Sequence, residues 1–148
     1  RGCIETVASG HGIARLGQLA LERGENTLIG ELSDNDPNAV TSEIIFDAAA
    51  RNDATALQIV KRLGILLGRL CVNLVYMDQP KKIVVIGGLV DQKKWVLPQI
   101  VETMSENCWL IKKGFVDCEV LFSELGDTAG ALGAIHMARD YCESVKNK

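Results

Sequence analysis

The stretch from Asp53 to Pro80 constrains the fold more than any other part of the chain. Apolar or small residues recur along it every three or four positions, at Leu57, Val60, Gly64, Leu67, Cys71 and Leu74. Aspartate is a favoured N-cap, and proline cannot continue a helix, so the pattern predicts one long helix between Asp53 and Pro80. From residue 63 to residue 77 the sequence is apolar nearly all round, which is typical of a buried helix.

Two glycines, Gly64 and Gly68, lie four residues apart on one face of this predicted helix. Each lowers helix propensity by roughly 1 kcal/mol relative to alanine. Their position therefore predicts a compensating contact, in which a neighbouring backbone packs closely against this face.

The second half of the chain changes its pattern. "KKIVVIGG" is a short β-branched run that ends in two glycines, which predicts a buried strand and a tight turn. A helix over 95–107, a second strand in "CEVLFSEL" and a final helix in "GDTAGALGAIHMARDYCESV" follow, with Asp127 as the expected N-cap. The stripe of the final helix comprises Leu132, Ile135, Ala138, Cys142 and Val145. This order predicts an α/β fold with a crossover, parallel or mixed strands and helices packed on the sheet.

The first half of the chain is expected to contain two helices joined by a loop. Apolar spacing predicts a helix over residues 4–22, with Gly24 as its stop, and a second helix in "SEIIFDAAARN". Between them, "GENTLIGELSDNDPNAV" is rich in Asn, Asp and Gly and predicts a loop.

Composition excludes several classes of protein. A length of 148 residues suits one domain, and a net charge of −3 without a long basic run argues against direct nucleic-acid binding. The most apolar stretch, "LGILLGRLCVNLVYM", is too short to span a bilayer and is interrupted by Arg69 and Asn73. The five cysteines are odd in number and scattered, which indicates reduced thiols in the cytoplasm.

From the residues alone, the functional motifs leave alternatives open. "VVIGGLV" fits a ligand site at the carboxyl end of a strand, or an ordinary strand-exit turn. "LGDTAGALGA" fits an anion or adenine site at a helix start, or close packing of helix on sheet. Glu5 alone is compatible with an exposed acid in the first turn of a helix. Neither a dinucleotide fingerprint nor a P-loop motif occurs.

Three stretches taken together, "RGCIETVASGHGIAR", "IVVIGGLV" and "LGDTAGALGAIHMA", resemble the C-terminal half of the repressor, ORF, kinase (ROK) family. The resemblance runs from Arg1 to Tyr141. It implies that residues 1–148 form the C-terminal lobe of an actin-like ATPase (ribonuclease H-like) fold, with a short sheet flanked by helices, one of them long and buried. The phosphate loop and catalytic aspartate would belong to an N-terminal lobe preceding Arg1, so no catalytic residue is expected here.

The resemblance also implies roles for individual residues. Cys3 would be the last of three cysteines that join a histidine around a structural zinc, a set suited to tetrahedral Zn²⁺. Glu5 would contact the sugar, and Gly87 and Gly88 would face the adenosine of ATP. Leu89 stands where the family usually has a third glycine, so its side chain is expected beside the adenosine.

Two functions follow from the resemblance. The first is the sugar- and nucleotide-binding lobe of a sugar kinase that uses ATP and Mg²⁺ on a hexose or N-acetylhexosamine and is inactive as an isolated fragment. The second is the effector-binding and dimerisation lobe of a sugar-responsive transcriptional repressor. A homodimer without membrane contact is expected in both cases. A generic α/β ligand-binding or interaction module is the third hypothesis.

Overall fold

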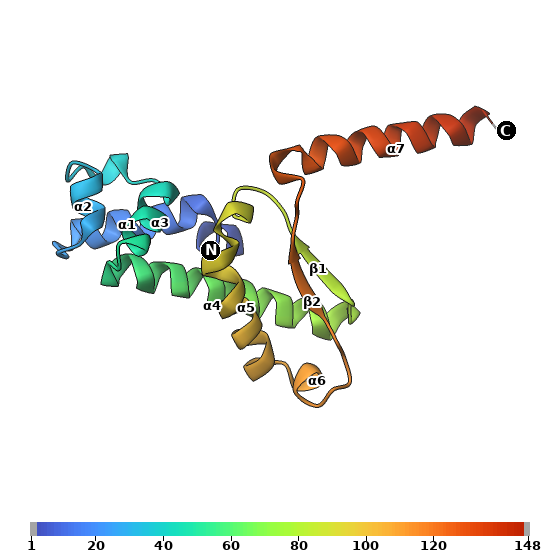
Figure 1. The fold of residues 1–148 in the computed structure, drawn as a ribbon, viewed down its shortest axis with the longest axis horizontal. Helices are drawn as coiled ribbons and strands as arrows, with labels where there is room; N and C mark the ends of the chain where they lie inside the picture. The colour runs from blue at the N-terminus through green and yellow to red at the C-terminus, as the bar shows by residue number, and fades with distance from the viewer. Residues whose placement is uncertain (1–2, 147–148) are drawn as a thin grey trace.

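The computed structural model describes residues 3–146 of the chain. Its longer helices are α1 (Gly10–Glu22), α3 (Ser42–Ala50), α4 (Ala54–Asp78), α5 (Lys93–Asn107) and α7 (Ala129–Lys146). Its strands are β1 (Lys82–Val85) and β2 (Glu119–Phe122). Short helices are η1 (Ile4–Thr6), α2 (Leu28–Leu32), η2 (Pro37–Ala39), η3 (Val90–Gln92), α6 (Trp109–Lys112) and η4 (Gly126–Thr128). In Figure 1, α4 runs the length of the body, with α1 to α3 at one end and the strands at the other.

The predicted long helix is confirmed as α4. The Asp53 carboxylate accepts a hydrogen bond from the Ala56 N–H at 2.8 Å, so it caps the helix as expected. The helix ends at Asp78, because Gln79 adopts a left-handed conformation (φ 48°) and Pro80 follows. Leu63 and Val75 are fully buried, but the last turn departs from the expected burial. Tyr76 is 48% exposed and Met77 is 82% exposed.

The close packing predicted at the two glycines is also confirmed. A Cβ added at Gly64 would lie 2.5 Å from the Gln99 Cβ, and one added at Gly68 would lie 2.6 Å from the Thr103 Cβ. Both neighbours belong to α5, whose backbone carbonyls lie within 3.2 Å of the same positions. The missing side chains therefore let α4 and α5 approach each other, and this contact forms the middle of the core.

The strands form a parallel pair in the register Lys82↔Glu119 to Val85↔Phe122, with α5 in the crossover between them. The predicted parallel arrangement is thus confirmed. Val120 and Phe122 of β2 are buried in the core, but the prediction that the first strand is buried was wrong. In β1, Val84 is 55% exposed, and Ile86 just beyond the strand is 61% exposed. One face of this sheet is therefore packed, and the alternate residues of β1 are left open.

The helix expected over residues 4–22 is interrupted, and that prediction was wrong at its start. Residues 4–6 form the 3-10 helix η1, and α1 begins only at Gly10, where the Ser9 hydroxyl accepts a hydrogen bond from the Gly12 N–H at 3.1 Å. A Cβ on Gly12 would lie 2.8 Å from the backbone carbon of Val7. Gly12 therefore lets the preceding segment fold back on the start of α1.

The loop expected over 24–40 contains two short helices, which corrects the prediction. Thr27 caps α2 by accepting from the Ile29 N–H, and Ile29 is fully buried. The Asp53 carboxylate fastens this segment to α4, since it accepts from the Thr27 hydroxyl at 2.8 Å and from the Leu28 N–H at 2.9 Å. Burial opposes ionisation of Asp53, but these hydrogen bonds prevail and lower its pKa.

Helix α7 extends away from the body of the structure (Figure 1). Its predicted apolar stripe is exposed: Leu132 by 38%, Ile135 by 63% and Val145 by 56%. The expected N-cap, Asp127, lies within η4, and its side chain is outside the described residues. Across residues 3–146, we find no helix with both the length and the hydropathy needed to cross a bilayer.

Candidate functional site

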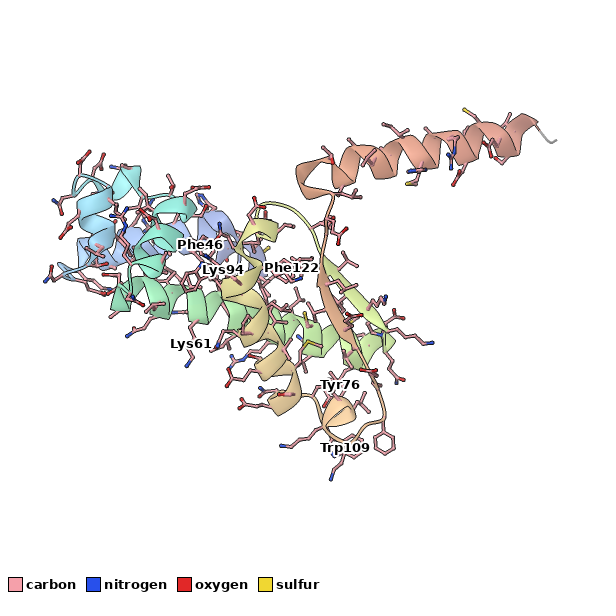
Figure 2. All side chains as sticks on the ribbon, viewed as in Figure 1. Phe46, Lys61, Tyr76, Lys94, Trp109 and Phe122 are labelled. Atoms are coloured by element: carbon pink, nitrogen blue, oxygen red, sulfur yellow. The ribbon has the colours of Figure 1, made fainter. Side chains whose placement is uncertain are left out.

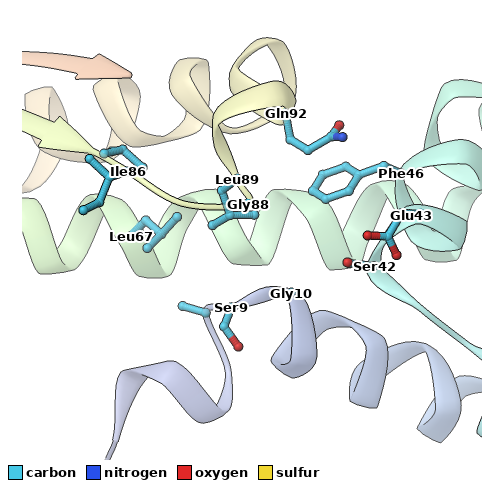
Figure 3. A pocket seen from close by; sticks show the side chains of 12 residues that line it. Ser9, Gly10, Ser42, Glu43, Phe46, Leu67, Ile86, Gly88, Leu89 and Gln92 are labelled. Atoms are coloured by element: carbon cyan, nitrogen blue, oxygen red, sulfur yellow. The ribbon is translucent and has the colours of Figure 1, made fainter. Parts of the chain in front are cut away.

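A pocket of about 400 Å³ lies where β1 ends, between the N-terminal ends of α1 and α3 and beside the middle of α4 (Figure 3). Carboxyl ends of parallel strands are where α/β proteins bind their ligands. Its lining residues are Ala8, Ser9, Gly10, Ser42, Glu43, Phe46, Leu67, Val85, Ile86, Gly88, Leu89 and Gln92.

The turn after β1 forms one side of this pocket. Gly87 has a φ of 89°, which residues with a side chain rarely adopt, and its carbonyl accepts from the Val90 N–H at 3.1 Å. A Cβ on Gly88 would meet nothing within 4 Å, so the backbone of Gly88 is open to the pocket. Leu89 has an ordinary φ of −86°, and its side chain forms part of the wall.

Helix N-termini supply the polar side. Ser9 and Gly10 come from the start of α1, and Ser42 and Glu43 come from the start of α3, where Thr41 accepts from the Ile44 N–H. Hydrogen bonds from the Glu43 backbone and the Thr41 side chain hold the pKa of Glu43 below its usual range. Glu43 is therefore an ionised acceptor at neutral pH, suited to ligand hydroxyl groups.

The opposite walls are apolar. Phe46 of α3, Leu67 of α4 and Leu89 face the pocket, and Figure 3 shows the Phe46 ring on the same side as Gln92. An apolar wall with a few convergent polar groups is the usual composition of a small-molecule site. The pocket therefore has the composition of a small-molecule site.

Of the four site residues predicted from the sequence, two lie at the pocket and two lie outside it. Gly87 and Gly88 form the turn at the pocket, whereas Glu5 and Cys3 lie outside its lining. Glu5 is exposed in η1, and its carbonyl accepts from the Ser9 hydroxyl at 2.7 Å, so it is tied to the start of α1. Cys3 is exposed at the residue before η1.

The described residues do not build a zinc site around Cys3. No group of three or more His, Cys, Asp or Glu side chains within residues 3–146 is arranged to hold a metal ion. Since tetrahedral Zn²⁺ needs four ligands, Cys3 with its described neighbours does not fit the metal. Its predicted role as a ligand stays a prediction.

Sequence reasoning missed Ser42, Glu43, Phe46 and Gln92, although each lines the pocket. The one available signal was the Thr41–Ser42–Glu43 helix start, because N-termini of helices attract polar ligands. The position of Phe46 and Gln92 depends on how α3 and η3 meet β1, which no local pattern encodes.

The thiols of Cys71, which is buried, and Cys118, which is partly buried, do not line this pocket. Burial raises the pKa of Cys71 to about 11, so its thiol is protonated at neutral pH and is a poor nucleophile. Burial and the nearby charge of Asp117 also raise the pKa of Cys118.

The parallel strands, the crossover helix and the pocket at the strand ends define an α/β lobe with a candidate ligand site. Comparison with known proteins identifies its kind. The model of the ROK family matches residues 1–141. This chain belongs to the ROK family.

Two relatives show the range of the family. Glucokinase of Halalkalibacterium halodurans is 30% identical over 132 residues, which are 89% of this chain and 39% of the relative. The DNA-binding transcriptional repressor Mlc of Escherichia coli is 27% identical over 131 residues, which are 88% of this chain and 31% of the relative. The chain thus spans about two fifths of the glucokinase and a third of the repressor.

A solved structure confirms the fold. A ROK family glucokinase from Streptomyces griseus, in complex with glucose and AMPPNP, matches with a TM-score of 0.81 at 26% identity. The match covers 95% of this chain and 45% of that one. The expected actin-like ATPase fold is therefore confirmed.

Proposed function

We propose that this chain is the C-terminal, sugar- and nucleotide-binding lobe of an ATP-dependent sugar kinase acting on a hexose or N-acetylhexosamine. The pocket at the end of β1 carries the proposal, because its apolar wall and ionised rim suit an adenosine. The similarity to glucokinases, one of them in complex with glucose and AMPPNP, supports this choice.

In this proposal the open backbone at Gly88 lets the nucleoside approach, and Gly87 provides the turn. The side chains of Phe46 and Leu89 would pack against the adenine base. The Glu43 carboxylate would accept hydrogen bonds from the ribose hydroxyls. ATP would supply the phosphoryl group. Phosphoryl transfer also needs Mg²⁺ and a base at the attacking hydroxyl, and we assign neither to the described residues.

Glu5 is the proposed sugar ligand. A carboxylate accepts charge-assisted hydrogen bonds from sugar hydroxyls, and Glu5 is exposed and tied through Ser9 to the first turn of α1. Because Ser9 also lines the pocket, a sugar at Glu5 would lie on the same side of the lobe as the nucleotide.

Titration calorimetry with AMPPNP tests the nucleotide site. Gly88→Val adds a side chain into open space, so the fold tolerates it while the pocket is obstructed. We expect binding to weaken about tenfold or more, the loss associated with an obstructed contact. Gly133→Val in α7, where a Cβ also meets nothing within 4 Å, is the matched control and should bind normally. Absence of AMPPNP binding, or equal binding by both variants, would contradict the nucleotide assignment.

The similarity to Mlc favours a second candidate, the effector-binding lobe of a sugar-responsive repressor. Such a lobe would bind sugar through Glu5 without needing ATP. A chain that binds glucose or N-acetylglucosamine, loses that binding on Glu5→Gln and ignores AMPPNP would support the repressor. A chain that binds neither ligand would leave only the generic interaction module. We include a homodimer in both proposals.

A further inference from the structure

Gln92 differs from the residues that precede the first four α-helices. The N-caps of α1, α2, α3 and α4 are Ser9, Thr27, Thr41 and Asp53, and the side chain of each accepts a hydrogen bond from its own helix. Gln92 occupies the N-cap position of α5, yet its side chain makes no capping hydrogen bond. Glutamine is also not among the favoured N-cap residues. Such a departure from a local rule, at a residue that lines a pocket, is expected where a side chain serves a ligand.

The backbone holds Gln92 at the pocket. Its N–H donates to the Leu89 carbonyl at 3.0 Å, which fixes η3 to the turn after β1. The side chain is half-buried, and Figure 3 shows it extending from η3 toward Phe46. Figure 2 likewise shows Phe46 near Lys94, which belongs to the first turn of α5. The amide group of Gln92 therefore lies in the pocket wall beside the aromatic ring.

Gln92 also differs in chemistry from the other polar side chains of the pocket. Ser9, Ser42 and Glu43 come from the starts of α1 and α3. Each serine offers a single hydroxyl, and the ionised Glu43 carboxylate is an acceptor only. Gln92 carries the one side-chain amide among the described lining residues, with an NH₂ donor and an oxygen acceptor side by side in one plane. It can therefore pair with two neighbouring atoms of a flat ring, one of them a donor and the other an acceptor.

Adenine presents such a pair of atoms, and guanine does not present it at the same edge. The N6 amino group of adenine is a donor beside the N7 acceptor, whereas guanine has two acceptors there, O6 and N7. Glutamine pairs bidentately with the adenine atoms. With guanine, the amide could use only its NH₂ group and would leave its own oxygen unpaired. A base packed flat on Phe46 would have its polar atoms in the plane of the ring, toward a side chain beside the ring.

We propose that Gln92 determines which base this chain prefers, by pairing with N6 and N7 of adenine and discriminating against guanine. The inference rests on the proposed nucleotide site, because it assigns the recognition of the base within that site. The apolar side chains of Phe46 and Leu89 pack against either purine, so they do not provide this selection. A polar group that the wrong ligand leaves unpaired discriminates much more strongly than an apolar contact does.

Titration calorimetry with AMPPNP and GMPPNP tests the inference through the ratio of the two dissociation constants. The parent chain should prefer AMPPNP about tenfold or more, as a bidentate contact provides. Gln92→Met keeps an unbranched side chain but removes the amide, so the variant should lose most of this preference. Gln58→Met, at an exposed position of α4 outside the pocket, is the matched control and should keep the parent ratio. Circular dichroism checks that both variants keep their helix content.

A second nucleotide locates the contact on the base. 7-Deaza-ATP lacks the N7 acceptor and should bind the parent chain severalfold more weakly than ATP, the loss expected for one hydrogen bond. Gln92→Met should bind ATP and 7-deaza-ATP equally, because it has no amide to donate to N7. An equal loss in the parent chain and in Gln92→Met would show that another group contacts N7 and would overturn the assignment.

The remaining outcomes separate this inference from the proposed function. If the parent chain binds AMPPNP and Gln92→Met keeps its full preference over GMPPNP, the inference fails while the nucleotide site stands. The same holds if the substitution weakens both nucleotides equally, because Gln92 would then only shape the pocket. Equal binding of the two nucleotides by the parent chain also overturns the inference. If neither nucleotide binds the parent chain, the proposed function fails and the inference fails with it.

Discussion

Helices α4 and α7 have similar apolar stripes but opposite environments. Along α4, Leu63 and Val75 are fully buried, whereas along α7 Ile135 is 63% exposed and Tyr141 is 71% exposed. The difference lies in what each helix meets, because α5 returns across the sheet and packs on α4, while α7 leaves the body after β2 (Figure 1). An apolar stripe therefore predicts a helix and which of its faces is hydrophobic. It does not predict which element, if any, packs on that face.

The largest difference is expected for leucine truncation. Leu63→Ala in α4 should lower the free energy of unfolding by about 2–5 kcal/mol, because it leaves a cavity in a fully buried site. Leu132→Ala in α7 should change it by no more than about 0.5 kcal/mol, the usual effect at exposed positions. Urea denaturation followed by circular dichroism measures both. Equal costs would mean that α7 is packed in solution.

Glycine-to-alanine substitutions compare the space around the backbones of α4 and α7. Gly68→Ala forces a Cβ to within 2.6 Å of Thr103 and 3.1 Å of the Ile100 carbonyl, so α4 and α5 must separate. Overpacking of this kind should cost about 1–3 kcal/mol. Gly133→Ala in α7 meets nothing within 4 Å and should raise helix stability by up to about 1 kcal/mol. The signs of the two changes in melting temperature should therefore be opposite, and a stabilising Gly68→Ala would refute the close contact.

Among the destabilising changes at α4, the smallest is expected at its N-terminal cap. Asp53→Ala removes the acceptor of the Thr27, Leu28 and Ala56 bonds and should cost about 1–2 kcal/mol at neutral pH. The folded-state pKa of Asp53 is lowered, so its contribution is present above its ordinary pKa and is lost as pH falls through the folded value. Stability curves against pH should show a weaker acid dependence in Asp53→Ala than in the parent chain.

Asp36→Ala, at the exposed cap of η2, is the control for the cap experiment. It removes a single local bond to Asn38 and should cost less. If Asp53→Ala keeps the full acid dependence of the parent chain, another carboxylate is responsible for it.

Features encoded locally were predicted well from the sequence. Asp53 and Pro80 bound α4 as expected, and Gly64 and Gly68 correctly indicated a close neighbour. Features that depend on distant contacts were missed. Helix α2 was not predicted because it is stabilised by burial of Ile29 in the core and by the hydrogen bond to Asp53, which is distant in the sequence. The break before α1 was not predicted because it depends on the packing of Gly12 against Val7.

The candidate site divides in the same way. Gly87 and Gly88 were found because a strand that ends in two glycines is a local signal. Glu43, Phe46 and Gln92 were not, because they come from two segments, α3 and η3, that meet β1 only in the fold. The exposure of Tyr76 was missed as well, since apolar spacing does not reveal where a core ends.

Amide hydrogen exchange tests the central contrast residue by residue. Amides of α4 between Leu63 and Val75 should exchange only by global unfolding, because they lie in the packed core. Amides of α7 between Leu132 and Tyr141 should open with a much smaller free energy, because few contacts hold that helix to the body. Protection of α7 equal to that of α4 would contradict the account, and protection of α4 as weak as that expected of α7 would contradict it equally.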